Sequence, residues 1–409
     1  MGKLFGTDGI RGVVGETLTA ELAYRVGQAI TIVLTEQKGS APTITIGKDT
    51  RISSDMLESA LMAGICAMGG SVMPFGTIPT PAVAFLTVQE EADAGIVISA
   101  SHNPYEHNGI KIFGAQGYKL SDEMEEKVEN IVLSKESLPV KTRDQIGMRL
   151  HGMRQMKSDY IDHLLSTVDC DMRGLRVLVD CANGAASATA PDLFRALPLH
   201  ADFIHTEPDG VNINENCGAT HPEEMCRLVR EHHADVGISL DGDADRVIFS
   251  DANGNVVNGD RIIGLCALDY KAEGKLSSDS IAVTSMSNMG LIAAMKQAGI
   301  NVEITAVGDR YVIERMKEKN IKLGGEQSGH LIFLDYATTG DGIISALHVL
   351  KLMKEKNMTL AEMASFMEEY PQHLESMKVR EKRPVAEITG LPELIAQAEQ
   401  EFGENGRVV

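Results

Sequence analysis

The chain has 409 residues, a formal net charge of −20 at pH 7, and a composition of 43% hydrophobic and 23% charged residues. This length exceeds what one hydrophobic core usually serves and predicts about three domains of globular type. The acidic balance excludes a surface that wraps nucleic acid or anionic lipid, because both need clustered lysine and arginine.

Short β-rich runs alternate with helical stretches along the chain. Residues 43–46 predict a strand that is followed by a helix over 56–68, and residues 176–179 predict another strand before a helical stretch. The pattern recurs where a strand over 281–284 leads into a helix over 291–298. Such alternation predicts an α/β fold with mainly parallel strands, whose ligands lie in the loops after strand ends.

One internal similarity indicates that these units are related. Residues 92–96 (ADAGI) resemble residues 234–238 (ADVGI), 142 positions later, and each segment runs along an expected strand into a polar loop. Under that offset Ser101 falls opposite Asp243. We expect duplicated units whose equivalent strand ends carry different chemical groups. Chance similarity of two buried strands is the alternative.

Linkers and turns suggest the domain limits. Polar residues around 141–155 resemble a first linker, the turn over 251–254 marks a hairpin near a second, and the third lies near 368–371. Beyond it we expect a strand over 374–379 and a helix over 391–402, too few residues for a complete domain of that design. The predicted domains are 1–153, 154–253, 254–368 and 369–409.

Two further classes of protein are disfavoured. No apolar run reaches the roughly 18 residues of a membrane helix, and residues 1–5 lack the features of a signal peptide, so we expect a cytoplasmic protein. The six cysteines are scattered, with no CxxC pair. This spacing supports neither a disulfide framework nor a zinc site, and buried thiols are the simpler interpretation.

An acidic loop follows an apolar run in the middle of the chain. Asp241, Asp243 and Asp245 occupy alternate positions, a spacing that lets three hard oxygen ligands converge on one divalent cation. A calcium EF-hand starts in the same way, but it requires Gly and Glu where this chain has Arg246 and Ala252. The loop therefore predicts a metal site, and a solvated acidic turn is the alternative.

Ser101 lies in a second polar loop after an expected strand. Asn103-Pro104 forces a turn, so we expect an exposed serine held by a stiff loop. The segment lacks the G-x-S-x-G elbow of a hydrolase nucleophile. A phosphoryl acceptor needs an accessible hydroxyl, a nearby metal and cations around the transferred oxygens. Pairing with the acidic loop favours that role over an ordinary turn serine.

Cations and a glycine-rich loop complete the candidate site. Lys111 could contact phosphate, or move a proton if its pKa is lowered, and Arg11 could grip phosphate bidentately. A solvated lysine and a surface arginine are the alternatives. Glu326, Ser328 and His330 share the loop over 324–330, whose donors and acceptors suit sugar hydroxyls or an amino group better than a structural turn. The chain has neither a dinucleotide fingerprint nor a Walker P-loop.

Four motifs together resemble the α-D-phosphohexomutase superfamily, most closely its bacterial phosphoglucosamine mutases. They are G-T-D-G-I-R-G at 6–12, S-A-S-H-N-P at 99–104, D-G-D-A-D-R at 241–246 and G-G-E-Q-S-G-H at 324–330. N-I-N at 212–214 and C-G-A-T-H-P-E at 217–223 favour that branch over phosphomannomutases and phosphoglucomutases. The resemblance implies three related α/β domains with mixed sheets around a central cleft, plus a smaller C-terminal α+β domain.

The resemblance also implies roles for individual residues. Ser101 would be the phosphoserine, and one Mg²⁺ would be held by its phosphate together with three aspartates, Asp241, Asp243 and Asp245. The transfer site would be lined by Arg11, Lys111 and Arg246, and the sugar would meet His102, Glu326, Ser328 and His330. Lys111 or His330 would move the hydroxyl proton.

The implied activity converts glucosamine 6-phosphate into glucosamine 1-phosphate through a 1,6-bisphosphate that is both intermediate and activator. This reaction would serve the synthesis of UDP-N-acetylglucosamine and cell-wall precursors.

The sequence departs from the family at its end. It stops at Arg407-Val408-Val409, about where the family's R-P-S-G-T-E-P loop should begin, so we expect an incomplete last domain. Phosphoglucomutase or phosphomannomutase activity, a non-catalytic sugar-phosphate binder and a metal-dependent phosphatase are the alternatives. A homodimer is left open.

Overall fold

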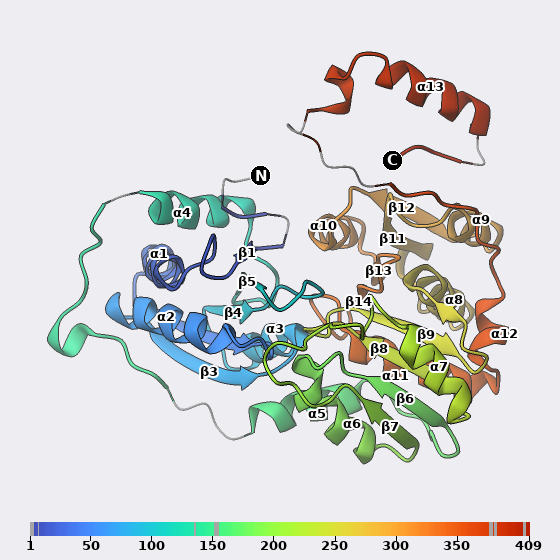
Figure 1. Cartoon of the computed structure of the whole chain (residues 1–409), viewed down its shortest axis with the longest axis horizontal. Helices are drawn as coiled ribbons and strands as arrows, with labels where there is room; N and C mark the ends of the chain where they lie inside the picture. The colour runs from blue at the N-terminus through green and yellow to red at the C-terminus, as the bar shows by residue number, and fades with distance from the viewer. Residues whose placement is uncertain are drawn as a thin grey trace.

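The computed structural model describes residues 4–6, 8–134, 136–150, 155–375, 379, 383–403 and 406–409. These residues form three α/β units and a C-terminal segment. In Figure 1 the first unit lies at the left, the second at the bottom and the third at the right, with the C-terminal helix above them.

The first unit contains a five-stranded mixed sheet in the order β1-β5-β4-β2-β3. Strand β2 runs parallel to β3 and β4, and β5 runs antiparallel to β4 and β1. The elements are β1 (Ile10–Val13), α1 (Ala20–Lys38), β2 (Thr43–Lys48), α2 (Ser54–Ala67), β3 (Ser71–Thr77), α3 (Thr80–Gln89), β4 (Ala94–Ile98), β5 (His107–Gly114) and α4 (Asp122–Leu133), followed by the 3-10 helix η1 (Arg143–Gln145).

The second unit has a sheet in the order β10-β9-β8-β6-β7. Strand β9 is antiparallel to β8 and β10, and the other pairs are parallel. The elements are α5 (Met156–Ser166), β6 (Arg176–Asp180), η2 (Ala185–Ala188), α6 (Ala190–Ala196), β7 (His200–Ile204), α7 (Glu223–Glu231), β8 (Val236–Leu240), β9 (Val247–Asp251) and β10 (Val256–Val257). The expected hairpin over 251–254 is confirmed. The predicted domain limit at 253/254 falls inside its turn, whereas the limit at 153/154 lies outside the described residues.

The third unit has a sheet in the order β12-β11-β13-β14. Its elements are α8 (Gly259–Ala272), η3 (Ser277–Asp279), β11 (Ser280–Thr284), α9 (Met289–Gln297), β12 (Asn301–Thr305), α10 (Asp309–Lys319), β13 (Leu323–Gly325), β14 (Leu331–Phe333), α11 (Gly342–Lys356) and α12 (Leu360–Ala364).

The three sheets share a four-stranded part with the same topology, which confirms the expected repeat. In each sheet the first long strand pairs in parallel with the next two, and a hairpin partner then adds antiparallel to the third. Strands β4 and β8 are both five residues long, fully buried and separated by the offset of 142 positions. Strands buried on both faces explain the continuous apolar runs in the sequence.

The C-terminal segment contributes η4 (Val385–Glu387) and α13 (Leu391–Phe402), and the latter matches the expected helix. Of the strand expected over 374–379, residues 376–378 lie outside the described residues, and the other three are not in a strand. Across the described residues, helices fall short of the length and apolar character needed to cross a bilayer.

Candidate active site

Three loops at the same position of the repeated sheet converge on one place. The loops join β4 to β5, β8 to β9 and β13 to β14, and they carry Ser101, the acidic triplet and Glu326 to His330 respectively. Contacts between their side chains, described below, bring the three units together at this point. The topology therefore explains why motifs far apart in the sequence meet.

Ser101 lies against the acidic loop. Its Oγ donates a hydrogen bond to Oδ2 of Asp241 at 2.5 Å, and its backbone N–H donates to the Ser99 hydroxyl at 2.9 Å. Ser101 has a φ of 52°, in the left-handed region that non-glycine residues seldom adopt. The expectation of an exposed serine is wrong, because Asp241 covers the hydroxyl and leaves the residue 1% exposed.

The three aspartates of the acidic loop form a compact oxygen cluster. Asp241, Asp243 and Asp245 are all buried, and each offers a carboxylate oxygen within 4.8 Å of the others. Burial and then the charges of Asp245 and Asp243 raise the pKa of Asp241 well above its usual value. Among the described residues, Oδ1 of Asp243 and Oδ1 of Asp245 have no hydrogen-bond donor although they are buried. A hard divalent cation fits this donor set and would satisfy these oxygens.

Lys111 supplies positive charge beside the cluster. Its Nζ lies 2.9 Å from Asp243 Oδ2, 3.3 Å from Asp245 Oδ2 and 3.4 Å from Asp8 Oδ2. Burial alone would lower the pKa of the ammonium, but the carboxylates of Asp243, Asp8 and Asp245 raise it well above its usual value. Lys111 is therefore a fixed cation here, and the lowered pKa that a proton shuttle requires is not found.

Arg11, Arg246 and His102 belong to the same group of charged and polar side chains. Arg11 pairs with Asp8, and Nε of Arg246 lies 3.9 Å from Asp245 Oδ1. Nε of both arginines is buried without a hydrogen-bond acceptor among the described residues. The His102 Nδ1 lies 3.4 Å from the Ser101 hydroxyl, and burial, Arg246 and Arg11 lower its pKa to about 4. The site thus offers unused donors for an anion.

The third loop divides its predicted residues between the interior and the surface. The Glu326 carboxylate accepts a hydrogen bond from Gly308 N–H at 3.1 Å and one from the exposed Ser328 hydroxyl at 3.3 Å. His330 is buried, with Nδ1 3.7 Å from Asp245. Its Nε2 accepts from Gly340 N–H at 3.1 Å. Burial opposes a charge on His330, yet Asp245 and other acidic neighbours raise its pKa. His330 therefore connects the third unit to the acidic loop.

Comparison with known proteins gives this arrangement a family. Models described as phosphoglucomutase/phosphomannomutase alpha/beta/alpha domains I, II and III match residues 2–139, 158–254 and 258–370. Over 412 residues the chain is 48% identical to a phosphoglucosamine mutase of Acetivibrio thermocellus, an alignment that spans 100% of this chain and 92% of that protein. The chain belongs to the phosphoglucosamine mutase family. A phosphoglucosamine mutase of Desulforamulus reducens is 49% identical, with the same shares covered.

Several solved structures have the same fold as this member of the phosphoglucosamine mutase family. A phosphoglucomutase/phosphomannomutase family protein from Burkholderia thailandensis matches with a TM-score of 0.78 and 25% identity, covering 89% of this chain and 79% of that one. An Aspergillus fumigatus N-acetylphosphoglucosamine mutase, solved with GlcNAc-6P and magnesium, matches with a TM-score of 0.67 and 18% identity. That alignment covers 97% of this chain and 88% of the fungal one.

Sequence reasoning missed several residues of the mutase site. Lys119 bridges Asp8 at 2.6 Å and Asp309 at 2.8 Å, which joins the first unit to the third. The Thr80 hydroxyl donates to Asp243 Oδ2 at 2.6 Å, which joins the first unit to the second. Asp8 stands inside the G-T-D-G-I-R-G motif and could have been found there. The others carry no local sequence signal.

A second group of candidate metal ligands has a structural explanation. Asp180, His205 and Cys217 lie close together in the second unit. One Asp180 oxygen accepts from Ala182 N–H and pairs with His205 Nδ1, both at 2.9 Å. The other accepts from Gly218 N–H at 2.8 Å and from a serine hydroxyl. These bonds use both oxygens of the carboxylate, so Asp180 holds the surrounding loops together.

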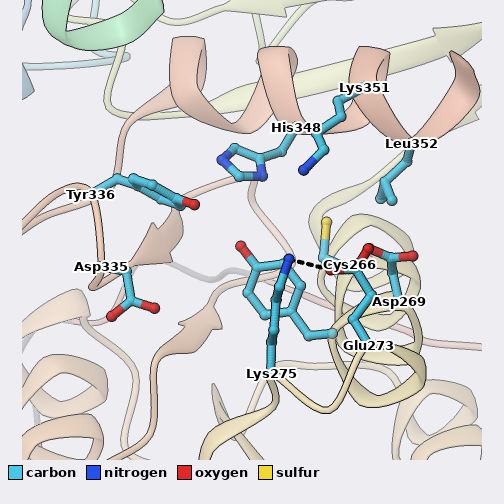
Figure 2. Close-up of a pocket in the computed structure, with 10 residues that line it drawn as sticks. Cys266, Asp269, Glu273, Lys275, Asp335, Tyr336, His348, Lys351 and Leu352 are labelled. Carbon is cyan, nitrogen blue, oxygen red and sulfur yellow. Dashed lines mark ion pairs between the residues drawn. The ribbon is translucent and has the colours of Figure 1, made fainter. Parts of the chain in front are cut away.

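A separate pocket of about 260 Å³ lies in the third unit, apart from these loops. Figure 2 shows it between α11, which carries His348 and Lys351, and α8, which carries Cys266. The His348 ring stacks on Phe333 at 4.8 Å between centroids, and its buried Nε2 has no partner among the described residues. Burial, with a smaller contribution from Lys351, lowers the pKa of His348 from 6.5 to about 4.

We expect His348→Phe to protect the protein against acid. The folded protein holds His348 neutral, whereas the unfolded chain takes up a proton on this residue below about pH 6.5. The free energy of unfolding therefore keeps its full value above pH 6.5 and decreases as the pH falls toward 4. The shift in the pKa of His348 corresponds to a loss of about 3 kcal/mol in the free energy of unfolding. A phenylalanine at this position avoids that loss because it does not titrate. Urea unfolding at pH 8 and pH 4.5 measures the effect. Equal loss of stability in both proteins on acidification would contradict it.

Proposed function

We propose that this chain interconverts glucosamine 6-phosphate and glucosamine 1-phosphate, with Ser101 as the residue that carries the phosphoryl group. The observation that carries the proposal is the contact between Ser101 Oγ and Asp241 Oδ2 within the acidic triplet. Curated relatives with 48–49% identity are named phosphoglucosamine mutases. We further propose that the reaction takes place in the cytoplasm.

The reaction consists of two phosphoryl transfers in opposite directions. In the first, the C1 hydroxyl loses its proton, its oxygen bonds to phosphorus, and the bond from phosphorus to Ser101 Oγ breaks, which gives glucosamine 1,6-bisphosphate and a protonated serine hydroxyl. In the second, the Ser101 hydroxyl loses its proton and bonds to the phosphorus of the 6-phosphate, the bond to the C6 oxygen breaks, and that oxygen takes up a proton, which leaves glucosamine 1-phosphate and restores the phosphoserine. Between the two steps the bisphosphate must turn over within the site.

The charged residues have complementary roles in these transfers. Asp241, Asp243 and Asp245 would hold Mg²⁺, which when bound neutralises charge on the transferred oxygens. The free Nε donors of Arg11 and Arg246 suit phosphate oxygens. Lys111, held as an ammonium by three carboxylates, suits a phosphate contact better than a proton acceptor.

The third loop fits recognition of the sugar. Glu326 and Ser328 carry an acceptor and a donor that match ring hydroxyls and the 2-amino group, while His330 and His102 flank the transfer site. A carboxylate near a protonated amine would favour glucosamine over glucose or mannose phosphates. This preference separates the proposed activity from its relatives in the superfamily.

The test supplies glucosamine 6-phosphate with Mg²⁺ and a catalytic amount of glucose 1,6-bisphosphate, and follows the phosphorus signals by NMR. We expect the 1-phosphate to accumulate, and no turnover when a chelator removes the metal. Glucose 6-phosphate and mannose 6-phosphate are run in parallel and should react more slowly. Faster turnover of mannose 6-phosphate, or release of inorganic phosphate, would contradict the proposal.

A further inference from the structure

Two side chains from different units bind the same two carbonyl groups of the Ser101 loop. Arg51 Nη2 donates to the Ser101 and Asn103 carbonyl oxygens, both at 2.9 Å. Asn214 Nδ2 donates to the same oxygens at 2.9 and 3.1 Å. Each carbonyl therefore accepts two hydrogen bonds, one from the first unit and one from the second.

The Arg51 side chain is also held by Asp49, a residue outside the Ser101 loop. Its Nε donates to Asp49 Oδ2 at 2.9 Å, and neither side chain has any exposed surface. Its Nη1 also donates to the Pro104 carbonyl at 2.7 Å. A buried guanidinium needs every donor paired, and this one is paired with backbone oxygens across three residues of the loop. The planar fork thus determines the shape of the loop that presents Ser101.

Asn214 connects the loop to the second unit. It lies between β7 and α7, and its own N–H donates to the Ala182 carbonyl at 3.0 Å. Both amide hydrogens are used by the two carbonyls, which fixes the orientation of the side chain. A Cβ added to Gly242 would lie only 2.6 Å from the Ser101 carbonyl oxygen and 2.8 Å from Asn214 Nδ2. The acidic loop, Asn214 and the Ser101 loop are therefore in direct contact.

We propose that Arg51 and Asn214 form a carbonyl clamp that positions Ser101 for phosphoryl transfer. Arg51 shapes the loop within its own unit, and Asn214 fixes the distance between the Ser101 hydroxyl and Asp241. The clamp stabilises the left-handed backbone of Ser101, a conformation that a residue with a side chain seldom adopts unless its surroundings hold it there. This inference rests on the proposed role of Ser101. Both residues act through the backbone and are positioning residues.

The first experiment replaces Asn214 by alanine in the full chain. Loss of the interunit bonds lets Ser101 shift relative to Asp241, and misplacement by about 1 Å can cost about 100-fold in rate. We expect kcat to fall by about that factor while KM stays within about threefold, since the sugar loop is untouched. The rate at which glucose 1,6-bisphosphate phosphorylates Ser101 in a single turnover, read by intact mass, should fall in parallel.

Asn212→Ala is the matched control. Asn212 belongs to the same N-I-N motif, and its amide also makes two local bonds, one to the Glu207 carbonyl and one from Asp209 N–H, both at 3.0 Å. Neither bond reaches the Ser101 loop. We expect this variant to keep kcat within about twofold of the parent. Thermal unfolding of both variants separates a loss of positioning from a loss of folding.

Arg51→Lys provides a second variant if Asn214→Ala does not fold. Lysine keeps the positive charge but cannot reach three carbonyls with a planar fork, so we expect a kcat loss of at least about tenfold with KM little changed. The clamp is overturned if Asn214→Ala, or in its absence Arg51→Lys, transfers phosphoryl at the parent rate. A rise in KM with kcat unchanged would overturn it equally. Neither result would contradict the proposed role of Ser101 as the phosphoryl carrier, because that role is tested separately by removing the Ser101 hydroxyl.

Discussion

Ser101→Ala should abolish mutase turnover, with a decrease in kcat of at least about 10⁴-fold. The variant has no side-chain oxygen at position 101 to accept or donate the phosphoryl group, so neither half of the cycle can occur. The fold should persist. The substitution removes one hydrogen bond, from Ser101 Oγ to Asp241, which is worth about 1 kcal/mol in a typical case.

Phosphorylation of the protein gives an independent readout of the same substitution. Incubation with glucose 1,6-bisphosphate should add one phosphoryl group to the parent protein and none to Ser101→Ala, as read by intact mass. Circular dichroism and thermal unfolding serve as the controls for folding. Appreciable turnover in the variant, or a phosphoryl group on it, would remove Ser101 from the scheme.

Asp241→Asn should have opposite effects on catalysis and on the stability of the metal-free protein. Loss of a ligand should raise the Mg²⁺ concentration for half-maximal rate by at least about 100-fold, beyond the effect typical of outer-shell partners. Without metal the same change removes one of three crowded buried carboxylates. We expect the metal-free protein to gain about 1 kcal/mol in stability.

The surroundings of Asp241 make asparagine a clean replacement. Oδ1 accepts a hydrogen bond from Arg246 N–H at 3.1 Å, and an amide oxygen can keep that bond. The other side faces the Ser101 hydroxyl, which can accept from the new amide. Asp243 is less suitable, because its Oδ2 receives both Lys111 and Thr80.

Thermal unfolding with and without Mg²⁺, beside a Mg²⁺ titration of the rate, checks both expectations. The parent protein should gain stability on adding Mg²⁺, as any ligand of the folded state confers. Without Mg²⁺, Asp241→Asn should be more stable than the parent protein, and adding Mg²⁺ should increase the stability of this variant only a little. An unchanged Mg²⁺ dependence of the rate would contradict the assignment of Asp241 as a ligand, and a lower metal-free stability would contradict the repulsion between the carboxylates.

The sequence contained enough to predict the architecture and the centre of the site. Two apolar strands that end in polar loops lie 142 positions apart, so the equivalence of Ser101 and Asp243 followed from local pattern alone. The helix over 391–402 and the hairpin over 251–254 also follow from local signals, namely Gly and Pro at a helix start and a D-A-N-G turn. Such features depend on neighbours in the chain.

The rest of the site depends on how the units dock, which no local pattern contains. Thr80 and Lys119 are ordinary residues in their own segments, and their roles arise from partners 163 and 190 positions away, Asp243 and Asp309. The burial of Ser101 has the same origin, because the side chain that covers it comes from another unit. The same holds for Arg51 and Asn214, because the loop that they bind is not adjacent to either of them in the sequence.

The distance along the chain between Ser101 and Asp241 has a consequence for inactivation. The two residues are 140 positions apart and belong to different sheets, so their contact exists only while two folded units are docked. The two units also share one continuous apolar core, to which α3 of the first and β6 and β8 of the second contribute, so they cannot separate without exposing apolar surface. Heat or denaturant should therefore remove enzyme activity and this shared core together, and activity should return only as the units dock again.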